Sequence, residues 1–225
     1  MLKPIIVAVD ETQLNSFKQI IDSLDNNLCM IKVGSVSFNA IGREAIEYVA
    51  AKGFKIFLDL KLHDIPNTVK KSIEGLISLP ISILTIHTSG GLEMMKVAKQ
   101  ALQGTDIKVF GVTALTSLSD EDTHTIYKRS ASEQVKAMLD LAEAAGIDGV
   151  VCSPHELELV KQTKSLESIT PGIRILKSND DQSRVMTPKE AITKGANHIV
   201  IGRPITSAPN INKALQEIHN SIELL

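Results

Sequence analysis

The chain has 225 residues, of which 43% are hydrophobic and 22% charged, so it can bury a core of the size usual for a globular protein. Its net charge of −2 argues against a nucleic-acid-binding protein, whose surface is usually basic. No apolar run approaches the roughly 20 residues of a membrane-spanning helix, and the first residues reach Asp10 too soon for a signal peptide. A cytoplasmic protein is therefore expected. The two cysteines, Cys29 and Cys152, lie in apolar runs and are predicted to be buried free thiols.

Eight short apolar runs, rich in β-branched residues, recur along the chain and are predicted to be strands. They are residues 4–9, 29–33, 55–60, 81–87, 107–113, 149–153, 168–172 and 198–202. Amphipathic segments separate them. In residues 131–146 the apolar side chains recur at helical spacing, and Gly146 stands where the helix should end. Pro66 marks the expected start of another helix, because proline is common at the first helical position.

The alternation of strands and helices, without a linker, predicts an α/β protein with a single domain over residues 1–225. Eight such units in a chain of this length favour a (β/α)8 TIM barrel. A doubly wound open sheet is the alternative, because periodicity alone does not decide whether the sheet closes. In a barrel, the carboxyl ends of the strands form the active-site face.

Polar side chains gather at the carboxyl ends of the predicted strands, whereas the strand starts show nothing comparable. In chain order they include Asp10, Lys32, Asp59, Lys61, Asp64, His87, Thr113, Thr116 and Ser153. One polar residue at one strand end is usually a satisfied structural group. Polarity at the same end of every strand is difficult to explain by packing and indicates a functional face.

The stretch FLDLKLHDIPNTV, residues 57–69, carries the densest charge. Asp59 and Lys61 are two positions apart, so on an extended strand both side chains point to one face, which Lys32 on the neighbouring strand could also reach. A buried ion-pair network without a function is the structural alternative. Burying ions costs several kcal/mol for each ion, so charges at this end of a barrel favour a functional site.

A phosphate site is predicted near the C-terminus. Gly202 and Arg203 directly follow the last strand; glycine lets backbone N–H groups approach an anion, and arginine offers a planar fork of donors. Barrels commonly bind phosphate in the loops after the seventh and eighth strands. The polar stretch 172–188, which contains Arg174 and Gln182, is expected to be a lid over an anionic ligand. A solvated loop without a role is the alternative.

The segment DLKLHDIPNTV (59–69) resembles the D-x-K-x-x-D signature of the orotidine 5′-monophosphate decarboxylase family in its longer form. Further segments resemble the family in the same order along the chain. They are VAVD (7–10), IKVG (31–34), TIHTSGG (85–91), VTALTS (112–117), GVVCSPHE (149–156), TPGIR (170–174), DDQSRVMTP (180–188) and VIGRPIT (200–206). The resemblance extends from the first strand to the last and is to the bacterial form of the family.

This resemblance implies an enzyme of de novo pyrimidine biosynthesis that converts orotidine monophosphate (OMP) to uridine monophosphate (UMP) and carbon dioxide. It implies no metal and no organic cofactor. By motif position, Lys61 is the expected proton donor to the ring carbon, and Asp59 is expected beside the substrate carboxylate. Lys32 and Asp64 would complete a Lys–Asp–Lys–Asp array, in which Asp64 comes from the partner subunit of a homodimer.

The resemblance also implies which residues bind the substrate. Asp10 and, from the partner subunit, Thr68 are expected at the ribose hydroxyls, and Thr116 and Ser153 along the pyrimidine. The residues expected at the pyrimidine edge and the phosphate are Arg174, Gln182, Gly202 and Arg203, and Pro171 completes the predicted binding set.

Two other functions are weighed against this one. Metal-dependent sugar-phosphate enzymes share the barrel and the D-x-K-x-x-D motif, but they place an acidic residue on the second strand to help hold magnesium, where this chain has Lys32. A non-catalytic barrel that binds nucleotides would not need the charges of residues 59–64. His63 is expected to be a structural hydrogen-bonding residue at the turn. His87 is left open between a role near the site and a role in the core.

Overall fold

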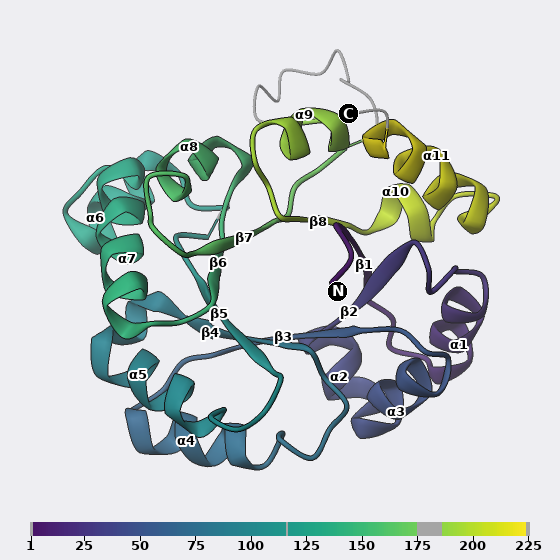
Figure 1. Ribbon diagram of the computed structural model, residues 1–225, viewed down its shortest axis with the longest axis horizontal. Helices are drawn as coiled ribbons and strands as arrows, with labels where there is room; N and C mark the ends of the chain where they lie inside the picture. Colours follow the sequence, from purple (N-terminus) through teal and green to yellow (C-terminus); the bar gives the residue numbers. More distant parts are fainter. Residues whose placement is uncertain (1, 116, 175–185, 224–225) are drawn as a thin grey trace.

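The strands close into a parallel barrel (Figure 1). The computed structural model describes residues 2–115, 117–174 and 186–223. The strands are β1 (Ile5–Val9), β2 (Cys29–Gly34), β3 (Ile56–Leu62), β4 (Ile83–His87), β5 (Lys108–Val112), β6 (Gly149–Val151), β7 (Glu167–Thr170) and β8 (His198–Ile201). Neighbouring strands pair in chain order, and β8 pairs with β1. The TIM-barrel prediction is therefore confirmed, and the open-sheet alternative is wrong.

The helices form a ring outside the barrel (Figure 1). They are α1 (Leu14–Asp22), α2 (Ser35–Ile41), α3 (Arg43–Ala51), α4 (Pro66–Glu74), α5 (Gly91–Ala101), α6 (Asp120–Tyr127), α7 (Ala131–Ala145), α8 (Leu157–Val160), α9 (Pro188–Thr193), α10 (Arg203–Thr206) and α11 (Ile211–Glu223), with 3-10 turns η1 (Thr88–Gly90) and η2 (Pro154–Glu156). The predicted helix ends are confirmed. Gly146 follows α7 in the left-handed conformation, with a φ of 69°, and Pro66 is the first residue of α4.

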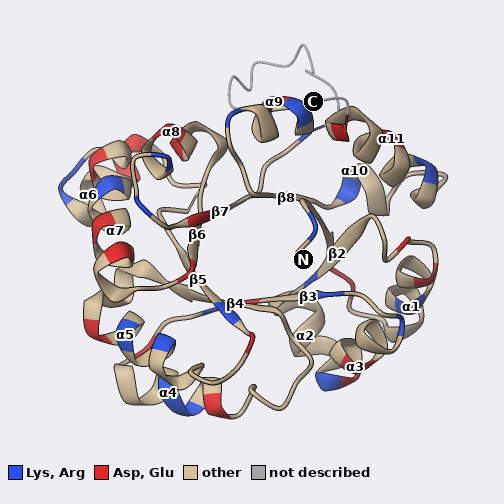
Figure 2. Cartoon of the chain, viewed as in Figure 1, with Lys and Arg blue, Asp and Glu red and all other residues tan. Residues whose placement is uncertain are grey.

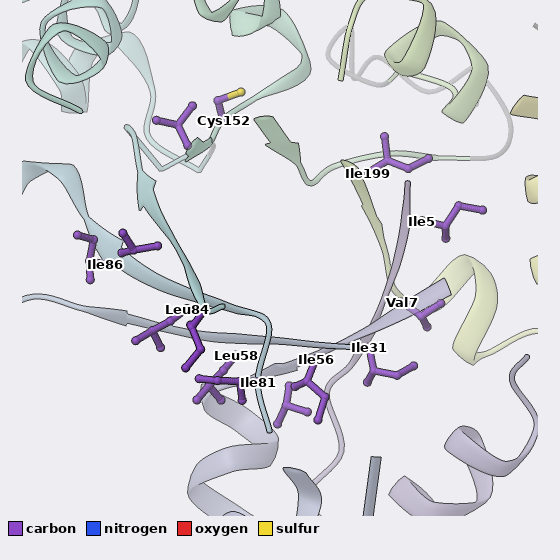
Figure 3. Packing of buried hydrophobic residues seen from close by; sticks show 14 of the residues in the cluster. Ile5, Val7, Ile31, Ile56, Leu58, Ile81, Leu84, Ile86, Cys152 and Ile199 are labelled. Carbon is purple, nitrogen blue, oxygen red and sulfur yellow. The ribbon is translucent and has the colours of Figure 1, made fainter. Parts of the chain in front are cut away.

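Alternate apolar side chains of the strands enter two separate layers, as the two-residue period of a strand requires. On β1, Ile5 and Val7 belong to the layer between the strands and the helices, whose packing is shown in Figure 3. The layer inside the barrel consists of Ile6, Ala8, Met30, Phe57, Ile83, Phe110, Ile169 and Val200. Side chains that continue this inner layer toward the carboxyl ends of the strands therefore reach the end of the barrel where the sequence predicts the active site.

Both cysteines are buried free thiols, as predicted. Burial raises the pKa of Cys29 to about 12, and burial also raises the pKa of Cys152. Because the thiolate is the reactive form of cysteine, these two side chains act as small apolar groups of the core.

The outer surface carries mixed charges. Acidic and basic residues are both present around the helical ring (Figure 2). Within the described residues, no helix is long and apolar enough to cross a bilayer.

The prediction that the strand starts lack notable polar residues is wrong. Lys108, Glu167 and His198 are the first residues of β5, β7 and β8, and they meet at the amino end of the barrel. Lys108 Nζ pairs with Glu167 Oε1, and His198 Nε2 lies 3.9 Å from Glu167 Oε2. This cluster could not be predicted from the sequence, because its members are far apart in the chain and each is a single polar residue next to an apolar run.

His198 should make the stability of the protein depend on pH. Its Nδ1 lies 2.8 Å from the carbonyl oxygen of Lys3, and burial lowers the pKa of the imidazole below its ordinary value of 6.5. The folded state then binds this proton less readily than the unfolded state. The contribution of neutral His198 to the free energy of unfolding is therefore complete above pH 6.5 and is lost as the pH falls toward the lowered pKa. The slope from one such group is at most about 1.4 kcal/mol per pH unit.

The measurement is the midpoint of thermal unfolding between pH 7.5 and 5.5 (about one unit to either side of the ordinary histidine pKa). His198→Asn keeps an N–H donor for the Lys3 carbonyl and should show a flatter pH dependence than the wild-type protein. His155→Asn, at an exposed position, is the control and should keep the wild-type dependence. Equal slopes for His198→Asn and the wild type would contradict the assignment.

Candidate active site

Three charged side chains converge at the carboxyl ends of β2 and β3. Lys61 Nζ lies 2.6 Å from Asp59 Oδ2, and Lys32 Nζ lies 3.7 Å from the same oxygen. Asp59 is only 6% exposed, so its carboxylate is held between two ammonium groups with little water around it. Lys32 Nζ also donates to Asp10 Oδ1 at 3.1 Å, which brings a fourth residue into the cluster. The structure thus brings together Asp10, Lys32, Asp59 and Lys61.

Lys61 reaches Asp59 by a route that the sequence did not predict. We expected both side chains to share one face of a regular extended strand. Instead, Lys61 has a φ of 51°, and the register between β3 and β4 shifts between Leu58 and Leu62. The Lys61 backbone therefore turns out of the regular strand, and this turn directs the side chain back toward Asp59.

Gly34 leaves room for the ammonium group of Lys32. A Cβ atom at Gly34 would lie 2.7 Å from Lys32 Nζ and 3.3 Å from Asp10 Oδ1. The first of these distances is shorter than a non-bonded contact allows. A residue with a side chain at position 34 would thus displace the lysine from its place between the two carboxylates.

The cluster borders a cavity of about 230 Å³ in the mouth of the barrel. Its lining residues are Lys32, Phe57, Asp59, Lys61, Val112, Ala114, Leu115, Val151, Cys152, Pro171 and Val200. The charged residues come from β2 and β3, and the other lining residues are apolar. This arrangement suits a flat ligand with an apolar ring and an anionic substituent.

Asp64 and Thr68 do not join the cluster within this chain. Both residues are exposed. Asp64 Oδ1 accepts a hydrogen bond from the Ile65 backbone N–H at 2.7 Å, and Thr68 lies in the first turn of α4. Ile65, which lies between them, is an apolar side chain that is 66% exposed.

The remaining predicted binding residues lie around the same end of the barrel. Ser153 is the N-cap residue of η2, and Gly202 is the N-cap residue of α10, which begins with the exposed Arg203. Arg174 is also exposed and donates its backbone N–H to the carbonyl oxygen of Met186. Thr116, Gln182 and most of the predicted lid lie outside the described residues.

His87 ends β4 beside the charged cluster. Its ring lies 5.2 Å from the ring of His63, centroid to centroid, at an interplanar angle of 37°. Burial is the main cause that lowers the pKa of His87, and the nearby charges of His63 and Lys61 lower it further. The structure therefore places His87 at the edge of the site and gives His63 a ring contact there.

Sequence reasoning missed one residue of this cluster, Thr85. It lies on β4 with 0% exposure, and its Oγ1 donates to Asp59 Oδ1 at 3.0 Å. Its spacing in the sequence could have indicated it. Ile83, Thr85 and His87 are two positions apart, so their side chains point to the same face of the predicted strand. Among the described residues, no group of three or more His, Cys, Asp or Glu side chains is arranged to hold a metal ion.

Comparison with known proteins shows similarity over nearly the whole chain. The family model described as orotidine 5′-phosphate decarboxylase / HUMPS family matches residues 3–218. Orotidine 5′-phosphate decarboxylase of Shewanella sediminis is 44% identical over 229 residues, covering 99% of this chain and 98% of the relative. The same enzyme of Saccharophagus degradans is 41% identical, covering 95% and 92%. The crystal structure of orotidine 5′-phosphate decarboxylase from Lactobacillus acidophilus superposes with a TM-score of 0.85 at 35% identity, covering 98% of this chain and 99% of that one.

Proposed function

The chain belongs to the orotidine 5′-phosphate decarboxylase family and is an OMP decarboxylase of pyrimidine biosynthesis, and from this we propose a direct decarboxylation that uses no cofactor. In this mechanism Lys61 donates the proton that replaces the lost carboxylate. The observation that carries the proposal is the position of Lys61 Nζ, 2.6 Å from the buried carboxylate of Asp59 and beside an apolar cavity.

The charges around Lys61 fit the chemistry of this reaction. Loss of carbon dioxide from the pyrimidine ring leaves a carbanion that the ring delocalises poorly, so the enzyme must supply fixed positive charge and a nearby proton. The ammonium group of a lysine carries both a positive charge and a proton that it can donate. Lys61, held by Asp59, can therefore stabilise the developing negative charge and then donate its proton to the ring carbon.

Asp59 and Lys32 have distinct roles in the proposal. We place the substrate carboxylate against Asp59, where repulsion between two negative charges in a site with little water opposes the ground state and is relieved as carbon dioxide leaves. Lys32 lies within 3.7 Å of Asp59 and 3.1 Å of Asp10, so it compensates both carboxylates before the substrate binds. Asp10 then remains available for the ribose hydroxyls.

Substrate binding is assigned to groups away from the reacting carbon. Arg174, Gln182, Gly202 and Arg203 are proposed to hold the phosphate and the pyrimidine edge, and Thr116, Ser153 and Pro171 to lie along the ring. Pro171 lines the cavity, which supports its part in this set. Binding energy from the remote phosphate can be used to close the site and exclude water, which raises the rate and not only the affinity.

The proposed enzyme is a homodimer with shared active sites. Asp64 and Thr68 are exposed in this chain, and the apolar side chain of Ile65 is exposed between them. A two-fold interface over this segment would cover Ile65 and carry Asp64 and Thr68 to the site of the partner subunit. The reduced, buried state of both cysteines agrees with the proposed cytoplasmic location.

The test of the proposed function is turnover without metal. Protein treated with EDTA should convert OMP to UMP at the rate of untreated protein, followed by the change in pyrimidine absorbance. Added magnesium should leave the rate unchanged, because an ammonium group at Lys32 does not ligate a cation. Turnover that disappears with EDTA and returns with magnesium would favour the metal-dependent sugar-phosphate enzymes, which should be tested with their own substrates.

A further inference from the structure

We propose that Thr85 is the positioning residue that holds Lys61 and Asp59 in their reactive arrangement. This inference rests on the proposed role of Lys61 as the proton donor. Thr85 is not among the residues that line the cavity, and its hydroxyl contacts Asp59 and Lys61, so we expect its effect to pass through these two residues.

Thr85 is a buried polar side chain on a strand whose residues Ile83, Leu84 and Ile86 are apolar. It lies in the middle of β4, with 0% exposure, two residues beyond Ile83 of the inner apolar layer. On this strand its side chain points inward, toward the neighbouring β3, which carries Asp59. A buried hydroxyl is stable there only when its hydrogen-bonding capacity is used.

The hydroxyl makes two hydrogen bonds, and their directions follow from the chemistry of the partners. An ionised carboxylate only accepts, so the Thr85 hydroxyl donates to Asp59 Oδ1 at 3.0 Å. Its oxygen is then free to accept the backbone N–H of Lys61 at 2.9 Å. One hydroxyl therefore connects the carboxylate of Asp59 to the backbone of Lys61.

The bond to Lys61 supports an unfavourable backbone conformation. Lys61 has a φ of 51°, in the left-handed region that side-chain-bearing residues rarely adopt. The register shift between Leu58 and Leu62 interrupts the pairing of β3 with β4 at this point. The Thr85 hydroxyl gives the Lys61 N–H a partner where the regular ladder is interrupted.

The bond to Asp59 gives the two oxygens of the carboxylate different partners. Oδ1 accepts from Thr85, while Oδ2 faces Lys61 at 2.6 Å and Lys32 at 3.7 Å. Without the hydroxyl, the carboxylate could rotate and the Lys61 turn would lose its support. Both changes move the ammonium group relative to the reacting carbon, whereas the phosphate and ribose contacts stay in place. The expected loss is therefore in kcat more than in KM.

The test compares variants of Thr85 that differ in the hydroxyl. Thr85→Val keeps the shape and removes both hydrogen bonds, and it should lower kcat by about 10²-fold, the size expected for a displacement of about 1 Å at a reacting group. The dissociation constant of UMP should change by less than about 5-fold, because uniform binding is retained. Thr85→Ser keeps the hydroxyl and should recover most of the lost kcat.

Thr88→Val is the matched control. Thr88 is equally buried and donates its hydroxyl to the Val112 carbonyl oxygen at 2.7 Å, away from the charged cluster. It should lose thermal stability as Thr85→Val does, but keep a kcat close to wild type. If Thr85→Val does not fold, Thr85→Ala replaces it, since alanine and serine differ at this position by the hydroxyl alone.

A second measurement does not depend on activity. Hydrogen exchange of the Lys61 amide should be slow in the wild-type protein and in Thr88→Val, and selectively faster in Thr85→Val. A near wild-type kcat in Thr85→Val, or an equal loss in Thr85→Val and Thr85→Ser, would overturn the inference; so would an unchanged Lys61 amide. A failure of the proposed role of Lys61 would give a different result. In that case Lys61→Ala would retain turnover, whether or not the exchange of the Lys61 amide is faster in Thr85→Val.

Discussion

Replacement of Lys61 by alanine is expected to lower kcat for OMP by at least about 10³-fold, because it removes the proposed general acid together with its positive charge. The remaining groups of the site keep their partners: Asp59 still accepts from Thr85 and lies 3.7 Å from Lys32. The variant should therefore fold and bind UMP. Single-turnover measurements of OMP decarboxylation, with calorimetric binding of UMP, check both parts of this expectation.

Lys18→Ala is the control for the loss of a lysine. Lys18 forms an ion pair with Glu44 at 3.1 Å on the outer helices and should be dispensable for turnover. Activity of Lys61→Ala within about 10-fold of wild type would exclude Lys61 as the proton donor, because general acids usually contribute more than this. Loss of UMP binding together with loss of the fold would instead assign Lys61 a structural role.

Mixed dimers of Lys61→Ala and Asp64→Ala subunits are expected to regain activity that neither variant has alone. If each site takes Lys61 from one subunit and Asp64 from the other, a mixed dimer has one site with both residues intact. Every mixed dimer then has one working site out of two, so purified mixed dimers should give about half of the wild-type rate per subunit. Co-expression with two different affinity tags, followed by a rate measurement on the doubly purified dimers, tests this.

The control pairs Lys61→Ala with Asp59→Asn. Asp59 and Lys61 contact one another within one chain, so a mixed dimer of these two variants has no intact site and should stay inactive. Recovery in this control would mean that subunits exchange residues in another way. No recovery in the first mixture, with the dimers verified by their tags, would contradict a shared site.

Much of the fold was predictable because its signals are local. Each predicted strand overlaps an observed one, since a run such as residues 4–9 shows its β-branched composition within a few positions. The ends of α4 and α7 were predictable for the same reason, because proline and glycine act through their own backbone. The convergence of Lys32 with Asp59 followed from the rule that the carboxyl ends of parallel strands share one face.

The parts that could not be predicted depend on contacts between distant segments. The left-handed turn at Lys61 occurs without a glycine, which would have indicated it in the sequence. The hydroxyl of Thr85, 24 positions further along the chain, supports this turn. The cluster of Lys108, Glu167 and His198 likewise assembles from three strands. A single polar residue in an apolar run does not indicate which polar residues of other runs it will contact in the folded protein.

By itself, the sequence determined the alternation of strands and helices, the end of the barrel at which Lys32, Asp59 and Lys61 gather, and the family to which the chain belongs. These depend on residue type, period and motif spacing, which are properties of short stretches of chain. Only the tertiary structure decided that the sheet closes, that Lys61 turns back to Asp59, and that Thr85 joins the two. Closure and register bring together residues that are remote in sequence, and the energy of a buried hydrogen bond or ion pair exists only once both partners share the same low-dielectric interior.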